Sequence, residues 1–509
     1  MSDKGTSGPL HLDGTPMTDR EVARGLRVNI VACCLGMMWF GAISGPPTTM
    51  LIECMTGSGI LIGLLATVGQ LALLAQFPGA VLLERLHERK KVWATLIIIH
   101  RLMWFIPALV PLLVSPTPGR AHAAAIMVVA AIALSAILGQ TGFPSWLSWV
   151  TDLVPKSASG RFWGLRQSIS TIPFLAATIG AGLVLDAFVD PRQPGGTYLG
   201  FTIVFAAAAV FGIADIIVHL WVPEPQRHIP EVPPKLLPLI LSPLRSADFR
   251  WMTFAIGAWF FGIALIGSFS IVYLKRCFHV SYTELSLLTF TGTLGPILAG
   301  YFLGRLIDRI GARSFGAIIL FSVPLLSLVW FFVSSEVFTI TLPLLGVRQI
   351  SQPVVIMLVA NLVGGAMAAG IGLCQIQLLS SLCEGRDKAM CIAVHYSILG
   401  LLAALGPLLG GYLMDMLSAH PLAWRLPTGE PVSFFHILVV IYILVVCGIG
   451  APCLLKVRLR TGEMPFLMAV GKLSVDPLKS GLSMVYGLLL DYAASPVTNL
   501  LTGKGEEKK

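Results

Sequence analysis

The most informative stretch of this sequence is a short charged one, Gly304-Arg305-Leu306-Ile307-Asp308-Arg309-Ile310-Gly311-Ala312-Arg313. It holds one carboxylate among three arginines. The glycines near its two ends permit a sharp turn or a close approach of two helices. The apolar runs 285–304 and 314–334 flank it, and each is close to the ~20 residues that a helix needs to cross a bilayer. We therefore predict that this stretch is a loop between two membrane-spanning helices.

The composition of the whole chain agrees with a membrane protein. Of its 509 residues, 55% are hydrophobic and 12% are charged, and the mean hydropathy is +0.82. Soluble proteins carry about 25% charged residues, so this much apolar surface does not fit one water-soluble core. The net charge of +9 does not indicate nucleic-acid binding, because the basic residues lie in short clusters between apolar runs.

Apolar runs of spanning length recur along the chain. Backbone N–H and C=O groups have no water partner in lipid, so these runs are predicted to be helices and the fold to be all-α. The sequence lacks the short alternating segments of a membrane β-barrel. We predict twelve spans, at about 29–52, 59–83, 92–114, 122–150, 162–188, 199–222, 250–274, 285–304, 314–334, 354–379, 389–417 and 433–456.

The basic residues are distributed unevenly between the two sides of these spans. If the N-terminus is cytoplasmic, the inner segments hold 28 of the 35 Lys and Arg residues and the outer loops hold six. Cytoplasmic loops of membrane proteins carry such an excess of positive charge. We therefore predict that both termini are cytoplasmic.

Proline and charge divide the chain into five parts. Residues 223–248 contain seven prolines and separate the spans into six and six, so we predict a cytoplasmic linker there. The expected parts are an N-terminal segment (1–28), an N-terminal six-helix bundle (29–222), the linker (223–248), a C-terminal six-helix bundle (249–456) and a cytoplasmic tail (457–509). Apolar residues at helical spacing between Leu478 and Tyr492 favour an amphipathic helix in the tail, with a loosely ordered tail as the alternative. Residues 338–350 are apolar but too short to span, and we expect them to pack on the outer surface.

The stretch Gly304–Arg313 resembles the signature loop of the major facilitator superfamily, G-x-L-x-D-R-x-G-x-R. A degenerate copy follows span 2, where Glu84 replaces the aspartate and His87 stands where glycine is usual. Residues 149–166 resemble the loop that several bacterial members of the superfamily carry between spans 4 and 5. The resemblance implies two pseudo-symmetric bundles and a bacterial inner-membrane transporter that works by alternating access.

The resemblance also implies a cytoplasmic gate. Asp308 would dock on the partly positive N-terminus of span 5, where Arg161 adds a charge-assisted bond. Glu84 and Arg85 would form a matching contact at the start of span 11. A chance polar loop with basic charges is the alternative. The remaining gate residues implied by the motif are Gly304, Arg309, Gly311 and Arg313.

Polar and aromatic side chains within the spans are candidates for a substrate cavity, because polar groups are costly inside a membrane. The resemblance places spans 1, 2, 4, 5, 7, 8, 10 and 11 around that cavity. The two prolines after Gly45 should break span 1 and present backbone carbonyls, unless neighbouring helices seal the break. The candidates are Trp39, Thr48, Gln140, Trp146, Arg166, Gln167, Asn361, Gln375, His395 and Tyr396.

Two of these candidates, Arg166 and His395, align when the loops before spans 5 and 11 are superposed. If both face the cavity, they favour an anionic or strongly polar substrate. Alternatively, Arg166 pairs with Asp152 or Glu84, and His395 is a hydrogen-bonded core residue. The cavity spans carry no Asp or Glu near mid-depth, which favours uniport, coupling through His395, or coupling through the charge of the substrate.

Two further charged residues lie inside spans 3 and 6. Arg101 is about 15 Å deep and Asp215 about 12 Å, at 1.5 Å per helical residue. We therefore predict a structural ion pair between them, with His219 one turn away from Asp215. A proton relay through Asp215 and His219 is the alternative.

No sequence pattern indicates a metal, a cofactor or a catalytic nucleophile, so we expect a carrier and not an enzyme. Its expected partners are a small solute and the lipid bilayer, without nucleic acid, and it is expected to be a monomer. A transporter-like assembly factor or sensor that does not transport is the alternative. Cys54 and Cys277 lie at outward span ends and are expected to be free thiols, with a disulfide as the alternative.

Overall fold

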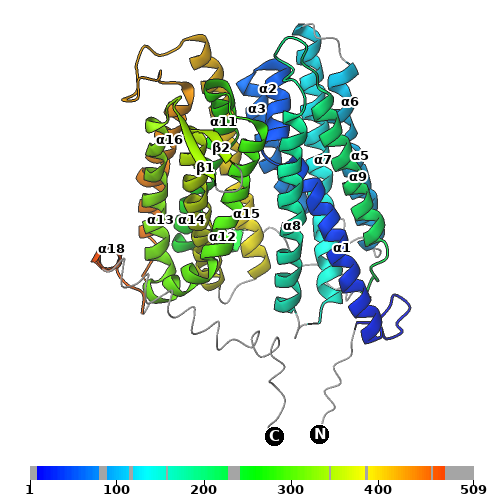
Figure 1. Cartoon of the computed structure of the whole chain (residues 1–509). Helices are drawn as coiled ribbons and strands as arrows, with labels where there is room; N and C mark the ends of the chain where they lie inside the picture. Colours follow the sequence, from blue (N-terminus) through cyan, green and yellow to red (C-terminus); the bar gives the residue numbers. More distant parts are fainter. Residues whose placement is uncertain are drawn as a thin grey trace.

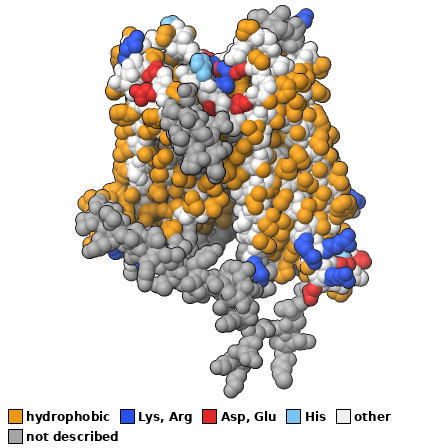
Figure 2. Space-filling view, viewed as in Figure 1, with side chains coloured by type: hydrophobic (Ala, Val, Ile, Leu, Met, Phe, Trp, Pro, Cys, Tyr) orange, Lys and Arg blue, Asp and Glu red, His pale blue; other side chains and the backbone are white. Residues whose placement is uncertain are grey.

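The computed structural model describes residues 9–79, 89–113, 118–155, 159–226, 241–342, 346–383, 388–459 and 462–475. Within them the chain forms two helical bundles that stand side by side (Figure 1). They meet at one end of the molecule, around Glu53, Asp186 and Asp415, which we call the closed end. They part toward the other end, where α1 (Asp19–Ile43) begins and α12 (Tyr282–Ile310) ends, and which we call the open end (Figures 1 and 2).

The N-terminal bundle is built around α1, which packs against α8 and α9, while α5 packs against α7. The N-cap residue of α1, Thr18, forms a reciprocal capping box with Glu21, which satisfies the first free amides of this helix. The elements are α1 (Asp19–Ile43), α2 (Pro46–Thr56), α3 (Gly59–Leu71), the 3-10 turn η1 (Ala72–Ala75), α5 (Arg89–Leu102), α6 (Phe105–Leu113), α7 (Pro118–Leu153), α8 (Ser159–Asp186) and α9 (Leu199–His219).

The C-terminal bundle repeats this arrangement, with α11 against α15 and α12 against α14. Ser281 caps α12 through a second capping box, with Glu284. The elements are α11 (Ala247–Phe278), α12 (Tyr282–Ile310), α13 (Ala312–Leu326), the 3-10 turn η3 (Ser327–Phe332), α14 (Gln352–Leu382), α15 (Lys388–Ala419), α16 (Phe434–Val445), the π-turn η4 (Val446–Gly450), α17 (Ala451–Leu455) and α18 (Phe466–Val475).

The described helices account for the predicted spans. Eleven are long and apolar enough to cross a membrane, and α12 makes a twelfth if Tyr282–Gly300 and Phe302–Ile310, which meet at 55°, form one span. Figure 2 shows apolar side chains over the sides of the molecule, with charged side chains gathered at its two ends. This distribution is that of an integral membrane protein.

Span 1 is broken where the sequence predicts it. The helix α1 ends at Ile43 and α2 begins at Pro46, with Gly45 between them at φ +70°. The prolines cannot donate the missing hydrogen bonds, and a positive φ favours glycine. The hydroxyl of Thr48 donates to the carbonyl of Ile43, so this carbonyl is bonded within the break and not presented to a ligand.

The apolar stretch 338–350 belongs to a β-hairpin between α13 and α14. Strand β1 (Val337–Leu342) pairs antiparallel with β2 (Gly346–Ser351), from Val337 opposite Ser351 to Leu342 opposite Gly346. The sequence analysis identified this stretch as too short to span but did not predict strands. The hairpin pairs backbone groups of this short segment between its own two strands.

Several predicted features lie outside the described residues. These are the amphipathic tail helix between Leu478 and Tyr492, most of the linker (residues 227–240), and the gate residues Glu84 and Arg85.

Candidate functional site

A cavity of about 600 Å³ lies inside the N-terminal bundle. Four of the predicted cavity residues line it together, although α1, α7 and α8 supply them: Trp39, Gln140, Trp146 and Arg166. The predicted ion pair and its neighbouring histidine line the same cavity. The substrate-cavity candidates and the ion pair, which the sequence analysis treated as separate features, therefore belong to one site.

The predicted contact between Arg101 and Asp215 is present, with 3.1 Å between Nη2 and Oδ2. Both side chains are buried, at 8% and 5% exposure. Two glycines make room for them. A Cβ at Gly36 would lie 2.7 Å from Asp215 Oδ2, and one at Gly212 would lie 2.5 Å from Arg101 Cδ. Larger residues at these two positions would therefore displace the ion pair.

A chain of hydrogen bonds leads from this ion pair to Arg166. His219 Nδ1 lies 2.8 Å from Asp215 Oδ1, and its Nε2 receives the indole N–H of Trp146 at 3.2 Å. Because an indole nitrogen only donates, Nε2 must accept, and the ring proton sits on Nδ1 facing Asp215. Asn29 contacts His219 Nε2 at 3.2 Å, and its oxygen accepts from Arg166 Nε at 3.1 Å.

Arg166 has no carboxylate partner among the described residues. Asp152, one of its two predicted alternatives, bonds Arg89 instead, and Glu84, the other, lies outside the described residues. The guanidinium carbon lies 4.8 Å from the ring centre of Trp146 and 5.4 Å from that of Trp163, within cation–π range. The neutral Asn29 is the one hydrogen-bond partner of Arg166 in the described chain.

Two indole nitrogens of the cavity are buried without a hydrogen-bond partner among the described residues, those of Trp39 and Trp104. The guanidinium of Arg101 lies 3.5 Å from the ring centre of Trp39, which holds this indole in place. Buried polar groups normally find partners, so two free donors in one cavity indicate room for an acceptor that the protein does not itself supply.

The structure of the C-terminal bundle corrects the prediction that His395 faces the substrate cavity. Its side chain is fully buried, and it contacts Thr253 Oγ1 through Nδ1 at 2.9 Å and Gln375 Nε2 through Nε2 at 3.0 Å. It is thus the hydrogen-bonded core histidine of the alternative reading and does not face a cavity opposite Arg166. Gln375, the partner of His395 Nε2, is buried as well, at 3% exposure.

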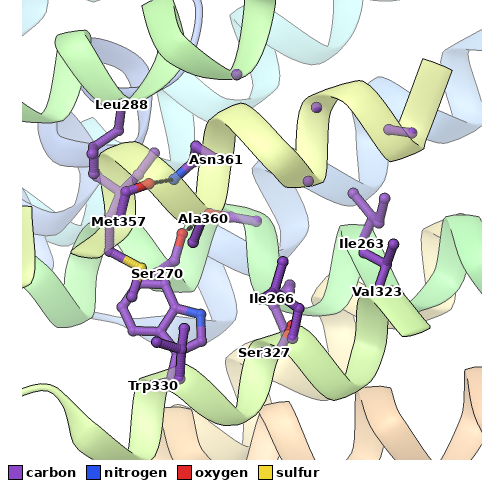
Figure 3. Close-up of a pocket in the computed structure, with 18 of the residues that line it drawn as sticks. Ile263, Ile266, Ser270, Leu288, Val323, Ser327, Trp330, Met357, Ala360 and Asn361 are labelled. Atoms are coloured by element: carbon purple, nitrogen blue, oxygen red, sulfur yellow. Dashed lines mark hydrogen bonds between the residues drawn. The ribbon is translucent and has the colours of Figure 1, made fainter. Parts of the chain in front are cut away.

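The interior of the C-terminal bundle holds a smaller cavity of about 380 Å³. Figure 3 shows its walls to be mainly apolar, with Ile263, Ile266, Leu288 and Trp330 pointing into it. Asn361 lines this cavity, and its amide donates to the carbonyl of Met357 in its own helix at 2.9 Å.

The remaining predicted cavity residues lie apart. Gln167 and Tyr396 are exposed on the surface of their helices, and Tyr396 is 43% exposed. Thr48 lines a cavity of about 370 Å³ between the bundles, to which α3, α11 and α15 also contribute. The structure therefore places the predicted candidates in three different cavities, in the buried core of the C-terminal bundle and on the surface, and among these cavities the one in the N-terminal bundle gathers several of them.

The closed end is held by two matching contacts that the sequence analysis did not foresee. Asp186, at the end of α8, accepts the backbone N–H groups of Tyr282 and Thr283 at 2.7 Å each. Asp415, at the end of α15, accepts those of Gly59 and Ile60 at 2.6 and 3.0 Å. Each carboxylate thus caps the first turn of a helix of the other bundle, where the helix dipole favours negative charge.

Glycines bring the bundles close behind these caps. A Cβ at Gly63 would lie 2.2 Å from the Pro407 carbonyl oxygen, and one at Gly411 would lie 2.2 Å from that of Gly59. On the other side of the interface, a Cβ at Gly182 would lie 2.6 Å from Ser286 Oγ. No larger residue fits these positions unless the backbones separate.

Ion pairs seal the closed end beyond the caps. Glu53 of α2 accepts from Arg276 of α11 at 2.5 and 2.9 Å, so the pair crosses between the bundles. Arg192 bonds both oxygens of Asp190 and lies 3.4 Å from Glu53. Burial alone would raise the pKa of Asp190, but the hydrogen bonds from Arg192 outweigh it and lower this pKa to about 2. Cys54 and Cys277, near this end, are free thiols.

The gate contact implied for the open end is not formed in this arrangement. Asp308 is exposed and has no hydrogen-bond or ion-pair partner in the described chain, and Arg161 at the start of α8 is also exposed. The loop binds its own bundle instead: Arg313 donates to the carbonyl of Leu455, and Gly311 adopts φ +97° beside Glu463. The reason is the separation of the bundles at this end.

Residue alignment could have revealed the caps. The register that aligns Arg166 with His395 also aligns Asp186 with Asp415 and Gly182 with Gly411. Both acids are at the outward ends of their spans, and no role was predicted for them from the sequence beyond the absence of Asp or Glu near mid-depth in the cavity spans. Arg89, fully buried between Asp152 and Glu224, carried no such signal, because its place in a basic cluster resembles a solvated loop.

Comparisons with known proteins place these features in a family. The sequence profile described as Major Facilitator Superfamily matches residues 28–336 and 255–465. Among solved structures, a bacterial metal transporter has a TM-score of 0.55 at 16% identity, over 87% of this chain and 99% of its own. A bacterial homologue of the iron transporter ferroportin in an inward-facing state has 0.56 at 14%, over 86% and 99%.

The nucleoside transporter NupG has a TM-score of 0.52 at 13% identity, over 85% of this chain and 100% of its own. At these identities the likeness concerns the fold. No curated protein sequence matches the chain significantly.

Proposed function

The chain belongs to the major facilitator superfamily, and from this premise we propose that it carries a small solute across a membrane by alternating access, as a secondary active or facilitative transporter. Membrane transport in general is supported by the family and by its structural neighbours. The protein is proposed to act as a monomeric carrier and not as an enzyme.

One observation carries the proposal: the bundles are joined at one end by paired contacts of the same kind and are separated at the other. Asp186 and Asp415 each cap a helix of the opposite bundle at the closed end. Asp308, at the open end, is exposed. A protein that opens one side while it closes the other requires interfaces that can be made and broken as units.

The excess of Lys and Arg at the open end gives the orientation. We propose that the open end faces the cytoplasm and the closed end the outside of a bacterial inner membrane, with both termini cytoplasmic. The structure then corresponds to an inward-open state. In the outward-open state, the caps at Asp186 and Asp415 would break and Asp308 would reach the first turn of α8, where Arg161 lies.

Direct measurement of transport tests the proposal. Purified protein in proteoliposomes is exposed to a mixture of small metabolites, and the solutes that accumulate are identified by mass spectrometry. We expect at least one solute to accumulate well above its level in empty liposomes. The matched control is Gly411→Trp, because a large side chain there cannot fit against Gly59 and holds the closed end apart.

Equal accumulation by the wild-type protein and Gly411→Trp would refute transport by alternating access. Accumulation by the wild-type protein no higher than in empty liposomes would favour the second class considered from the sequence, an assembly factor or sensor with a transporter fold. A version of each protein labelled for detection confirms that both are inserted in equal amounts.

A further inference from the structure

We propose that the cavity of the N-terminal bundle binds a monovalent organic anion, a carboxylate on a planar apolar body, and that Arg166 is the group that binds the carboxylate. This inference rests on the proposed transport function, because it names the class of solute. It depends on three observations: the charges around the cavity, the geometry of Arg166, and the nature of the cavity walls.

The charges that line the cavity do not balance. Its lining contains two arginines and one aspartate, together with His100 and His219. Arg101 and Asp215 neutralise each other at 3.1 Å. His219 accepts through Nε2 from an indole and is therefore neutral in this arrangement. One positive charge, on Arg166, is left, so a single negative charge on the ligand would balance the cavity.

The position of Arg166 favours binding of a ligand over a structural role. It is seven residues beyond Ser159, at the start of α8, so it lies about 10 Å along the helix from the open end. Asn29 holds Nε, and the ring of Trp146 lies against the guanidinium. The terminal nitrogens have no hydrogen bond within the described chain. A guanidinium held in this way presents two parallel N–H donors, which match the two oxygens of a carboxylate.

The walls of the cavity favour a planar apolar body. Aromatic rings line it from α1, α5, α7 and the turn between α5 and α6, and they include Trp39, Phe40, Trp104 and Phe143. The indole N–H groups of Trp39 and Trp104 are unpaired within the described residues, so they can donate to an acceptor on the far part of the ligand. A volume of about 600 Å³ lies within the range of cavities that hold small organic ligands.

The same features disfavour other solutes. A cation would meet the uncompensated charge of Arg166, and a sugar would leave most of the aromatic wall against hydroxyl groups. A polyanion would bring more negative charge than one arginine balances. A planar monoanion satisfies the charge, the free donors and the apolar surface together.

The test compares ligands that differ only in charge. Isothermal titration calorimetry on the purified full-length protein measures binding of 2-naphthoate and of its neutral amide, 2-naphthamide. We expect the dissociation constant of 2-naphthoate to be at least tenfold lower. Arg166→Gln should remove this difference, and Arg166→Lys should retain part of it, because lysine keeps the charge without the paired donors.

Arg24→Gln is the matched control. It removes the same charge from an exposed arginine at the open end of the same bundle, and it should leave the tenfold preference unchanged. If Arg24→Gln also abolishes the preference, the anion is attracted by general positive charge and the site is not Arg166. If Arg166→Gln does not fold, the Arg166→Lys variant and the two wild-type titrations still decide.

Two further outcomes of the titrations overturn the proposal. In the first, 2-naphthoate and 2-naphthamide bind the wild-type protein equally. In the second, neither they nor benzoate and octanoate bind at all. These results are independent of the transport assay: accumulation of a non-anionic solute refutes the inference and leaves transport intact, whereas anion binding without accumulation refutes transport and leaves the binding site intact.

Discussion

The two bundles share one scaffold but differ in the chemistry of their interiors. In the N-terminal bundle Asn29 and Trp146 meet Arg166, and in the C-terminal bundle Thr253 and Gln375 meet His395 on the corresponding helices. The first three residues place the charged Arg166 beside a cavity. The second three are neutral side chains that hydrogen-bond to one another. Repetition of a fold therefore preserves where side chains meet without preserving what they do.

The difference continues deeper in the bundles. The N-terminal bundle holds the ion pair Arg101–Asp215 in its cavity, whereas the C-terminal cavity is walled by residues such as Ile263, Leu288 and Trp330 (Figure 3). We infer that recognition of charge is concentrated in the N-terminal half and that the C-terminal half contributes packing and movement. Four experiments test this difference between the bundles.

Loss of the ion pair should have the largest effect. Removing one partner of a buried pair costs ~3–5 kcal/mol because the other charge stays buried alone. Arg101→Ala and Asp215→Ala should each lower the apparent melting temperature of the detergent-purified protein strongly, and the double variant Arg101→Met/Asp215→Leu should do so less than either. Arg24→Ala is the exposed control. Unchanged melting of both single variants would mean that the two interiors do not differ in stability.

Substitution of a hydrogen-bond partner should destabilise the protein more beside Arg166 than beside His395. Asn29→Leu leaves Arg166 Nε and one contact of His219 unsatisfied, which should cost ~1–3 kcal/mol. Thr253→Val removes one hydrogen bond to His395 with little change of shape and should cost ~0.5–1.5 kcal/mol. Chemical denaturation in detergent measures both. Equal losses would show that the charge of Arg166 adds nothing to the network.

The closed end, where the bundles are alike, should respond equally. Asp186→Ala and Asp415→Ala each remove a helix cap of ~1 kcal/mol, or about a fivefold change in an opening equilibrium. Hydrogen–deuterium exchange should rise about fivefold at the start of α12 in the first variant and at the start of α3 in the second. Glu284→Gln, within one bundle, is the control. A response in only one variant would break the symmetry of the closed end.

The smallest effect concerns pH at the closed end. The pKa of Asp190 is lowered to about 2, below the usual 3.8, so its ion pair with Arg192 stabilises the folded state fully above pH 4 and is lost as pH falls toward 2. Asp190→Asn should therefore melt slightly earlier than the wild type at pH 6, and the difference should vanish near pH 2. A difference that persists at pH 2 would point to packing of Asp190 and not to its charge.

The sequence predicted how deep a residue lies along a spanning helix better than it predicted which side of the helix the residue faces. Apolar runs and basic loops gave the spans, and distances along two helices were enough to pair Arg101 with Asp215. The rotation of each helix was not readable, because both the lipid-facing and the packed sides of a membrane helix are apolar and the usual periodicity is weak. His395 was therefore assigned to a cavity although it is buried, and Tyr396, its neighbour, is exposed.

Contacts between bundles were the least predictable feature. The motif around Asp308 implied a contact with the start of α8, but Asp308 is exposed at the end where the two bundles lie apart (Figure 1). The caps at Asp186 and Asp415 involve backbone N–H groups of the receiving helices, which leave no mark in the sequence of those helices. The hairpin β1–β2 was missed although Phe338, Ile340 and Leu342 alternate with Thr339 and Thr341, a pattern that is typical of a strand.

The use of backbone N–H groups as receivers has an evolutionary consequence. At the starts of α3 and α12, any residue other than proline supplies the amide N–H from which the aspartate accepts a hydrogen bond. The side chains of Ile60 and Thr283 can therefore be replaced without loss of the cap. Selection needs to retain only the acid on one helix and the glycine beside it. Two halves of a duplicated gene can thus diverge in what they recognise while the mechanical connection between them stays the same.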